Sequence, residues 1–128
     1  MVATPLKKQV IVENPIVSAV CQIPIAYRRS DRESLQQLVV KSGYFEKPDE
    51  LSVSAVAEFL RRNPELVDQW FYFCEDKRTT AGWYIIDERY RFVVGQINGP
   101  KMAISDRVAA CAEYVVREIG EVIPPNRR

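Results

Sequence analysis

The apolar residues of this chain change their spacing between Cys74 and Trp83. From Leu66 to Cys74 they recur at intervals of one, three and four, which is the period of a helix with one buried face. From Trp83 onward, "WYIID" and "RYRFVVGQI" are rich in aromatic and β-branched residues, as strands are. A chain with both periods must combine helices and strands. The junction falls within "CEDKRTTAGWYI", residues 74–85.

Two helices are predicted around Asn63-Pro64. Ser52 is placed to cap the first, whose Val53, Val56, Ala57 and Leu60 form one apolar stripe. Proline disfavours the helical conformation in the residue before it and suits the first position of a new helix. We therefore expect the first helix to end at Asn63 and the helix that carries "WFYF" to follow it directly.

Two further helices are predicted from caps and stripes. Ser30 and Glu33 have the spacing of a capping box, and Gly43 is placed to end the helix that follows. Ser105 is predicted to cap the last helix. The apolar residues of that helix share one face: Val108, Cys111, Ala112, Val115 and Ile119.

The strands are predicted at the N-terminus and in a hairpin. Gln9–Glu13 and Pro15–Ile25 are rich in Val and Ile, and Pro15 and Pro24 place them toward a sheet edge or a bulge. Asp87-Glu88-Arg89 is short enough to be the loop of a hairpin near residues 83–97. We predict an α+β fold in which a small antiparallel sheet, made of the N-terminal strands and this hairpin, packs against about four helices.

The length of 128 residues is that of one ordinary domain, and 47% hydrophobic with 27% charged residues is typical of a soluble globular protein. We predict a single domain over residues 1–128, with frayed ends at 1–8 and 123–128. Lys7 and Lys8 precede an apolar run that loosely resembles a signal peptide, but Glu13-Asn14-Pro15 interrupts it. We expect a cytoplasmic protein that does not contact a membrane.

The charged and reactive side chains exclude several kinds of site. A net charge of +1 argues against a dedicated nucleic-acid binder. The chain has no histidine, which excludes Ser-His and Cys-His nucleophile systems and histidine-ligated metals. Cys21, Cys74 and Cys111 lie far apart in apolar settings and are predicted to be buried free thiols. We predict no catalytic residue, no metal and no cofactor.

Acidic residues are concentrated in the middle of the chain. Residues 44–76 hold three basic and eight acidic side chains, a charge of −5, whereas the segments before and after each carry +3. Such a segment is either a set of solvated helix faces or a surface for a basic partner.

Two interpretations of "CEDKRTTAGWYI" remain open. In the first, acidic Glu75 and Asp76 end the helix, basic side chains after them complement its dipole, and Trp83 anchors the core. In the second, the segment is a recognition surface on a firm helix–strand scaffold. The residues assigned to partner binding in that case are Glu75, Asp76, Lys77, Arg78 and Trp83, together with Asp68 of the preceding helix.

Other candidate groups fit structure better than function. Asp87 and Glu88 suit the tip of a hairpin. Arg28, Arg29 and Arg32 flank a predicted helix start, where they either bind an anion or are simply solvated. The "WFYF" aromatics have helical spacing, which favours core packing over base stacking.

Part of the chain resembles a known class of proteins. A helix–Asn-Pro–helix unit, "EDKRTTAGWYI", a short hairpin with "VVGQI" and "ACAEYVVREI" in the last helix are similar to small bacterial immunity proteins of polymorphic toxin systems. The resemblance covers roughly residues 50–120. It implies a single-domain, cytoplasmic, non-enzymatic inhibitor that binds a toxin and occludes its active site.

Three hypotheses about function follow. The leading one is a protein-binding module, an immunity protein that neutralises a toxin. A second is a histidine-free enzyme or small-ligand pocket that uses Glu75, Lys77 and Arg78. A third is a homo-oligomeric structural subunit, such as a homodimer joined through the Pro15–Ile25 edge strand.

Overall fold

The computed structural model describes residues 14–30, 32–76 and 82–125. This part of the chain has an α+β fold, as predicted, with a three-stranded antiparallel sheet in the order β1-β2-β3. The α-helices are α2 (Pro15–Cys21), α3 (Ile23–Arg29), α4 (Leu35–Ser42), α5 (Val53–Arg62), α6 (Glu65–Asp76) and α7 (Arg107–Gly120). The strands are β1 (Trp83–Glu88), β2 (Arg91–Gln96) and β3 (Lys101–Ile104), and two 3₁₀ turns are η1 (Tyr44–Glu46) and η2 (Pro48–Glu50).

The predicted strand at Pro15–Ile25 is wrong, because this segment forms α2 and α3. Asn14 caps α2 by accepting hydrogen bonds from the N–H groups of Ile16 (2.9 Å) and Val17 (3.2 Å), and Pro15 occupies its first turn. The prolines therefore mark helix starts and not a sheet edge. The homodimer predicted through this edge loses its basis, and the other predicted N-terminal strand, Gln9–Glu13, lies outside the described residues.

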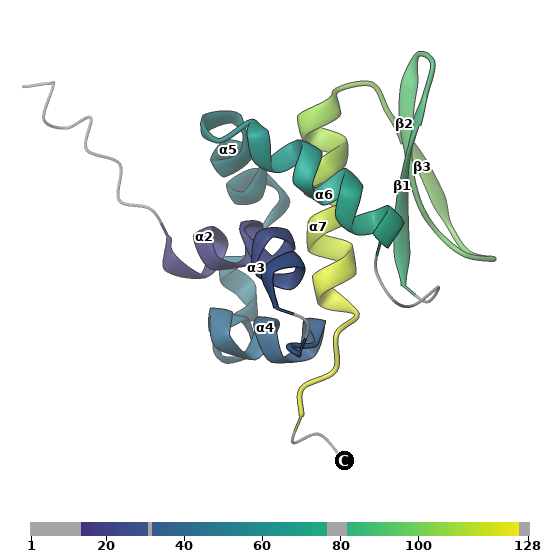
Figure 1. Ribbon diagram of the computed structural model, residues 1–128. Coiled ribbons are helices and arrows are strands. Elements are labelled where there is room, and N and C mark those ends of the chain that lie inside the picture. The colour runs from purple at the N-terminus through teal and green to yellow at the C-terminus, as the bar shows by residue number, and fades with distance from the viewer. Residues whose placement is uncertain (1–13, 31, 77–81, 126–128) are drawn as a thin grey trace, which may run out of the picture.

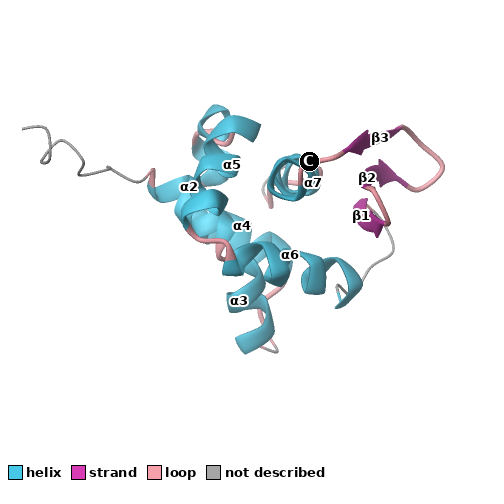
Figure 2. Cartoon of the chain, turned by 90° about the horizontal axis from the view of Figure 1, so that it is seen from above, coloured by secondary structure: helices cyan, strands magenta, loops and turns pink. Residues whose placement is uncertain are grey.

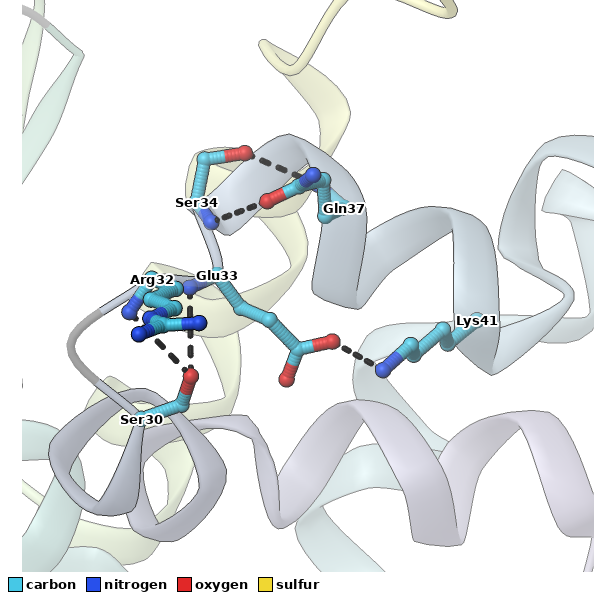
Figure 3. A network of polar contacts seen from close by, with 6 residues as sticks. All are labelled: Ser30, Arg32, Glu33, Ser34, Gln37 and Lys41. Atoms are coloured by element: carbon cyan, nitrogen blue, oxygen red, sulfur yellow. Dashed lines mark hydrogen bonds and ion pairs between the residues drawn. The ribbon is translucent and has the colours of Figure 1, made fainter.

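The first predicted capping box is also wrong, by four residues. Ser34 caps α4 and accepts from the Gln37 N–H at 3.1 Å, while the Gln37 side chain accepts from the Ser34 N–H at 2.7 Å (Figure 3). Ser30 instead accepts from the N–H groups of Arg32 and Glu33, at 3.3 and 3.2 Å. These N–H groups are thus already bonded and are not offered to an anion. The predicted end of the helix is confirmed, since Gly43 has the left-handed φ of 86°.

The predicted helix pair around Asn63 is confirmed. Ser52 caps α5 by accepting from the Ala55 N–H at 3.1 Å, and α6 begins just after Pro64. α7 is capped by Asp106, not by the predicted Ser105, with 2.8 Å between the Asp106 carboxylate and the Ala109 nitrogen. The described residues contain six α-helices and not about four, because the segment predicted as a strand, Pro15–Ile25, forms α2 and α3.

The predicted hairpin near residues 83–97 is confirmed, with its turn at Arg89-Tyr90 and not at 87–89. The sequence reading missed β3. After β2 the chain turns through Asn98, whose φ is 58°, and returns as β3 with Val94 opposite Met102. Four residues without clear alternation gave too weak a strand signal to detect.

α7 lies between the other helices and the sheet (Figures 1 and 2). Its buried residues Tyr114 and Ile119 belong to the same core as Trp70 of α6 and Leu60 of α5. The Trp70 indole N–H donates to the carbonyl of Cys21 at 2.9 Å, which ties α6 to α2. One core therefore joins helices and sheet. None of the helices in the described residues is both long and apolar enough to cross a membrane.

Candidate functional site

Helix α6 has a buried side and an exposed side. Trp70 and Phe73 are buried and pack edge to face, with 5.3 Å between ring centres, whereas Tyr72 is 52% exposed. Successive residues on a helix are about 100° apart, so Tyr72 points away from the core that its neighbours fill. We call the exposed side the α6 face and define it by four exposed residues: Glu65, Asp68, Tyr72 and Glu75.

The α6 face is a narrow stripe on a rigid element. Its members are three, four and three residues apart, which keeps them within about 80° of one another around the helix axis. With a rise of about 1.5 Å per residue, the stripe is about 15 Å long. Tyr72 is thus an exposed aromatic side chain with acidic residues on both sides. Figure 1 shows α6 running from α5 toward the sheet, with α3 beside it.

Two arginines border the α6 face. The Arg107 guanidinium lies 2.6 Å from the Asp68 carboxylate and 4.7 Å from the centre of the Phe71 ring. The Arg28 guanidinium, from α3, lies 5.5 Å from the centre of the Tyr72 ring. These contacts hold Asp68 and Tyr72 in position. Glu65 and Glu75 make no ion pair within the described ranges, so their charges face solvent.

The predicted partner-binding residues do not all lie on one surface of the described structure. Asp68 and Glu75 are exposed on the α6 face. Asp76 is the last residue of α6, and Lys77 and Arg78 lie outside the described residues.

Trp83 has a structural position. It is 6% exposed, and its backbone N–H donates to the Glu118 carboxylate at 2.8 Å. The Arg117 guanidinium lies 4.9 Å from the centre of its ring. The indole therefore packs between β1 and α7, which is the core-anchor interpretation, and it is not presented on the surface with Asp68 and Glu75.

The buried thiols are not arranged as nucleophiles. Burial raises the pKa of the Cys21 thiol to about 12, and burial raises that of Cys111 as well. Both thiols therefore stay protonated near neutral pH, and the thiolate is the reactive form. Cys74 is only partly buried, and its sulfur accepts from the Ile85 N–H at 3.4 Å. In the described part of the chain, no cluster of Cys, Asp and Glu is placed to hold a metal ion.

Three surface hollows lie away from the end of α6. Their volumes are about 310, 340 and 390 Å³, and Glu75 lines none of them. The first lies between Phe45 and Pro124, the second beside Arg29, and the third on the sheet beside Lys101. None of these three hollows would therefore bring a small ligand to Glu75.

Tyr72 is not among the residues predicted to bind a partner, because the helical spacing of "WFYF" favours core packing for the whole run. The signal was present in the spacing. Tyr72 is four residues after Asp68 and three before Glu75, about 160° around the helix axis from Trp70.

Comparison of the chain with protein-family models, with curated proteins and with solved structures finds no match.

Proposed function

We propose that this protein binds a partner protein through the α6 face and that the partner is a toxin, which it neutralises by covering the active site. The observation that carries the proposal is Tyr72, half exposed at the centre of an acidic stripe. Tyrosine is enriched among residues that dominate binding energy, because its large, stiff side chain buries much area at little entropic cost. The neutralising role comes from the resemblance over residues 50–120.

The charges of the α6 face define the partner surface. Glu65 and Glu75 lie near the two ends of the stripe, in the segment of charge −5, and neither forms an ion pair with another described residue. A basic patch on the partner would complement them. Such complementarity chiefly raises the association rate and is screened by salt. Binding is therefore expected to weaken as ionic strength rises.

The neutralising role is tested with the neighbouring genes. Each open reading frame immediately beside this one is expressed in a bacterial host, with and without this chain. We expect one neighbour to arrest growth and this chain to restore it. If no neighbour is toxic, or a toxic neighbour is not neutralised, the proposed role is wrong.

The surface is tested by calorimetry with the purified partner. Tyr72→Ala should weaken binding by at least about tenfold, or about 1.4 kcal/mol, the usual mark of an anchor residue. Tyr90→Ala is the matched control, because Tyr90 is 83% exposed in the β1–β2 turn, away from α6. If wild type and Tyr72→Ala bind the partner with equal affinity, the partner does not bind through the α6 face.

A further inference from the structure

The two edge strands of the sheet, β1 and β3, differ in whether their outward backbone N–H groups are hydrogen-bonded. At the β1 edge, the Trp83 N–H donates to the Glu118 carboxylate at 2.8 Å and the Ile85 N–H donates to the Cys74 sulfur at 3.4 Å. Unpaired N–H groups of an edge strand attract other strands. Here α6 and α7 supply side chains that take up two of them. Two outward N–H groups of the β1 edge are thus already bonded within the protein.

The β3 edge is open. The Gln96 N–H donates to the Pro100 carbonyl at 3.0 Å, and this bond fixes the alternation of the antiparallel ladder. Met102 and Ile104 then direct their backbone groups to β2, while Lys101 and Ala103 direct theirs outward. Among the described residues, no hydrogen bond outside the ladder uses the backbone of Lys101 or Ala103.

The outer face of the sheet lies beside this open edge. α7 covers the other face, and no described helix covers this one (Figure 2). Cross-strand neighbours Ile86, Val93 and Ala103 form an apolar row across it, with Ile86 48% exposed. A hollow of about 390 Å³ opens over this row and extends to Lys101 and Arg91.

The charge beside the β3 edge is positive. Arg91 forms an ion pair with Glu88 at 3.1 Å, so these two charges offset one another. Lys101 is exposed and has no ion pair within the described ranges. An acidic side chain opposite Lys101 would complement it.

A second copy of this chain fits the edge poorly. In the antiparallel register centred on Met102, β3 paired with its own copy would place Lys101 opposite Ala103 of the other copy, with the two lysines diagonal to each other at about 7–8 Å on one face. Strands of six, six and four residues also give the whole face of the sheet an area of only about 300 Å², against about 800 Å² per partner in a stable interface. A lysine on a short edge strand is a usual barrier to such self-pairing.

We infer that the β3 edge binds an extended segment of a partner protein, with alternating apolar and acidic residues, as an added fourth strand. Its backbone hydrogen-bonds to Lys101 and Ala103. Its apolar side chains lie beside Met102 and Ile104, which are half-buried on the inner side of the sheet. Its acidic side chains lie on the outer side, next to Lys101. This surface is separate from the α6 face, and the inference does not rest on the proposed function.

The inference is tested with a random 12-residue peptide library displayed on phage and selected against the full chain. We expect the enriched peptides to alternate apolar and acidic residues. Ala103→Pro removes an outward N–H and leaves the bonds to β2 in place, since proline is tolerated on edge strands. It should weaken binding of an enriched peptide at least tenfold, whereas Ala103→Ser, which keeps the N–H, should not.

Two further measurements apply if Ala103→Pro does not fold. Lys101→Glu changes only an exposed side chain, and it should weaken the same peptides at least tenfold. In the wild type, the bound peptide should slow hydrogen exchange of the Ala103 amide, while the Met102 amide is already protected. Failure to enrich any peptide, or peptides that bind Lys101→Glu as tightly as wild type, would overturn the inference. So would a homodimer in solution that Ala103→Pro dissociates.

Discussion

Glu75 opposes the stability of the helix that carries it. It is exposed in the last turn of α6, where the free carbonyl groups give the helix end a partial negative charge, and that turn contains no basic residue. A carboxylate there is unfavourable by about 0.3–1 kcal/mol. Glu65, on the same face, lies in the first turn, where a carboxylate is favourable. Both residues therefore add a negative charge to the α6 face, but Glu65 stabilises the helix and Glu75 destabilises it.

Glu75→Lys should increase the free energy of unfolding by about 0.3–1 kcal/mol and weaken binding of a basic partner. Glu65→Lys makes the same charge change on the same face and should weaken binding while lowering the free energy of unfolding by a similar amount. Urea unfolding at low ionic strength measures both variants. A Glu75→Lys protein less stable than wild type would contradict this account of the helix end.

Gly95 leaves room for a ring on the central strand β2. A β-carbon at this position would lie 2.7 Å from the Tyr84 hydroxyl oxygen and 2.9 Å from the γ-carbon of Lys101. Tyr84 from β1 therefore lies across the glycine and covers backbone that would otherwise face solvent. Strand β2 therefore needs a residue without a side chain at position 95, although strand propensity alone would favour a larger residue there.

Gly95→Val should lower the free energy of unfolding by about 1–3 kcal/mol, because the new side chain displaces the Tyr84 ring. The matched control is Ala103→Val, which adds the same residue to the same face at an exposed edge position and should change stability by less than about 0.5 kcal/mol. Thermal unfolding monitored by circular dichroism compares them. A Gly95→Val protein as stable as wild type would show that the ring does not hold this position.

Local signals predicted most elements, and the errors have physical causes. Asn63-Pro64 predicts a helix boundary, whereas at Asn14-Pro15 the Val and Ile that follow the same dipeptide predict a strand. In α2, Val17 and Val20 are three residues apart and buried, so their burial outweighs the strand propensity of valine. The acidic part of the α6 face could be found by spacing, whereas the burial of Trp83 depends on α7, far along the chain.

Helices and sheet share α7, and this makes the two parts one stability unit. α7 packs against α5 and α6 on one side and against β1 and β2 on the other. Trp70 lies among the helices and Trp83 in the sheet, both buried against the same core. Neither part buries its apolar side without α7, so neither is expected to remain folded when the other unfolds.

Unfolding should therefore be a single transition. Trp83→Phe leaves Trp70 as the only tryptophan, and Trp70→Phe leaves Trp83. In each variant, tryptophan fluorescence and far-ultraviolet circular dichroism should give the same urea midpoint. Different midpoints for the two probes within one variant would show that sheet and helices unfold separately.

The position of α7 in the chain also governs when the protein can fold during synthesis. The strands pair only with their neighbours in sequence, and α5 and α6 are joined by two residues, so both units use local contacts that form quickly. The helix between them is the last described element to leave the ribosome. Until residues 107–120 emerge, the nascent chain holds two half-built units with exposed apolar sides, and its core closes in one late step.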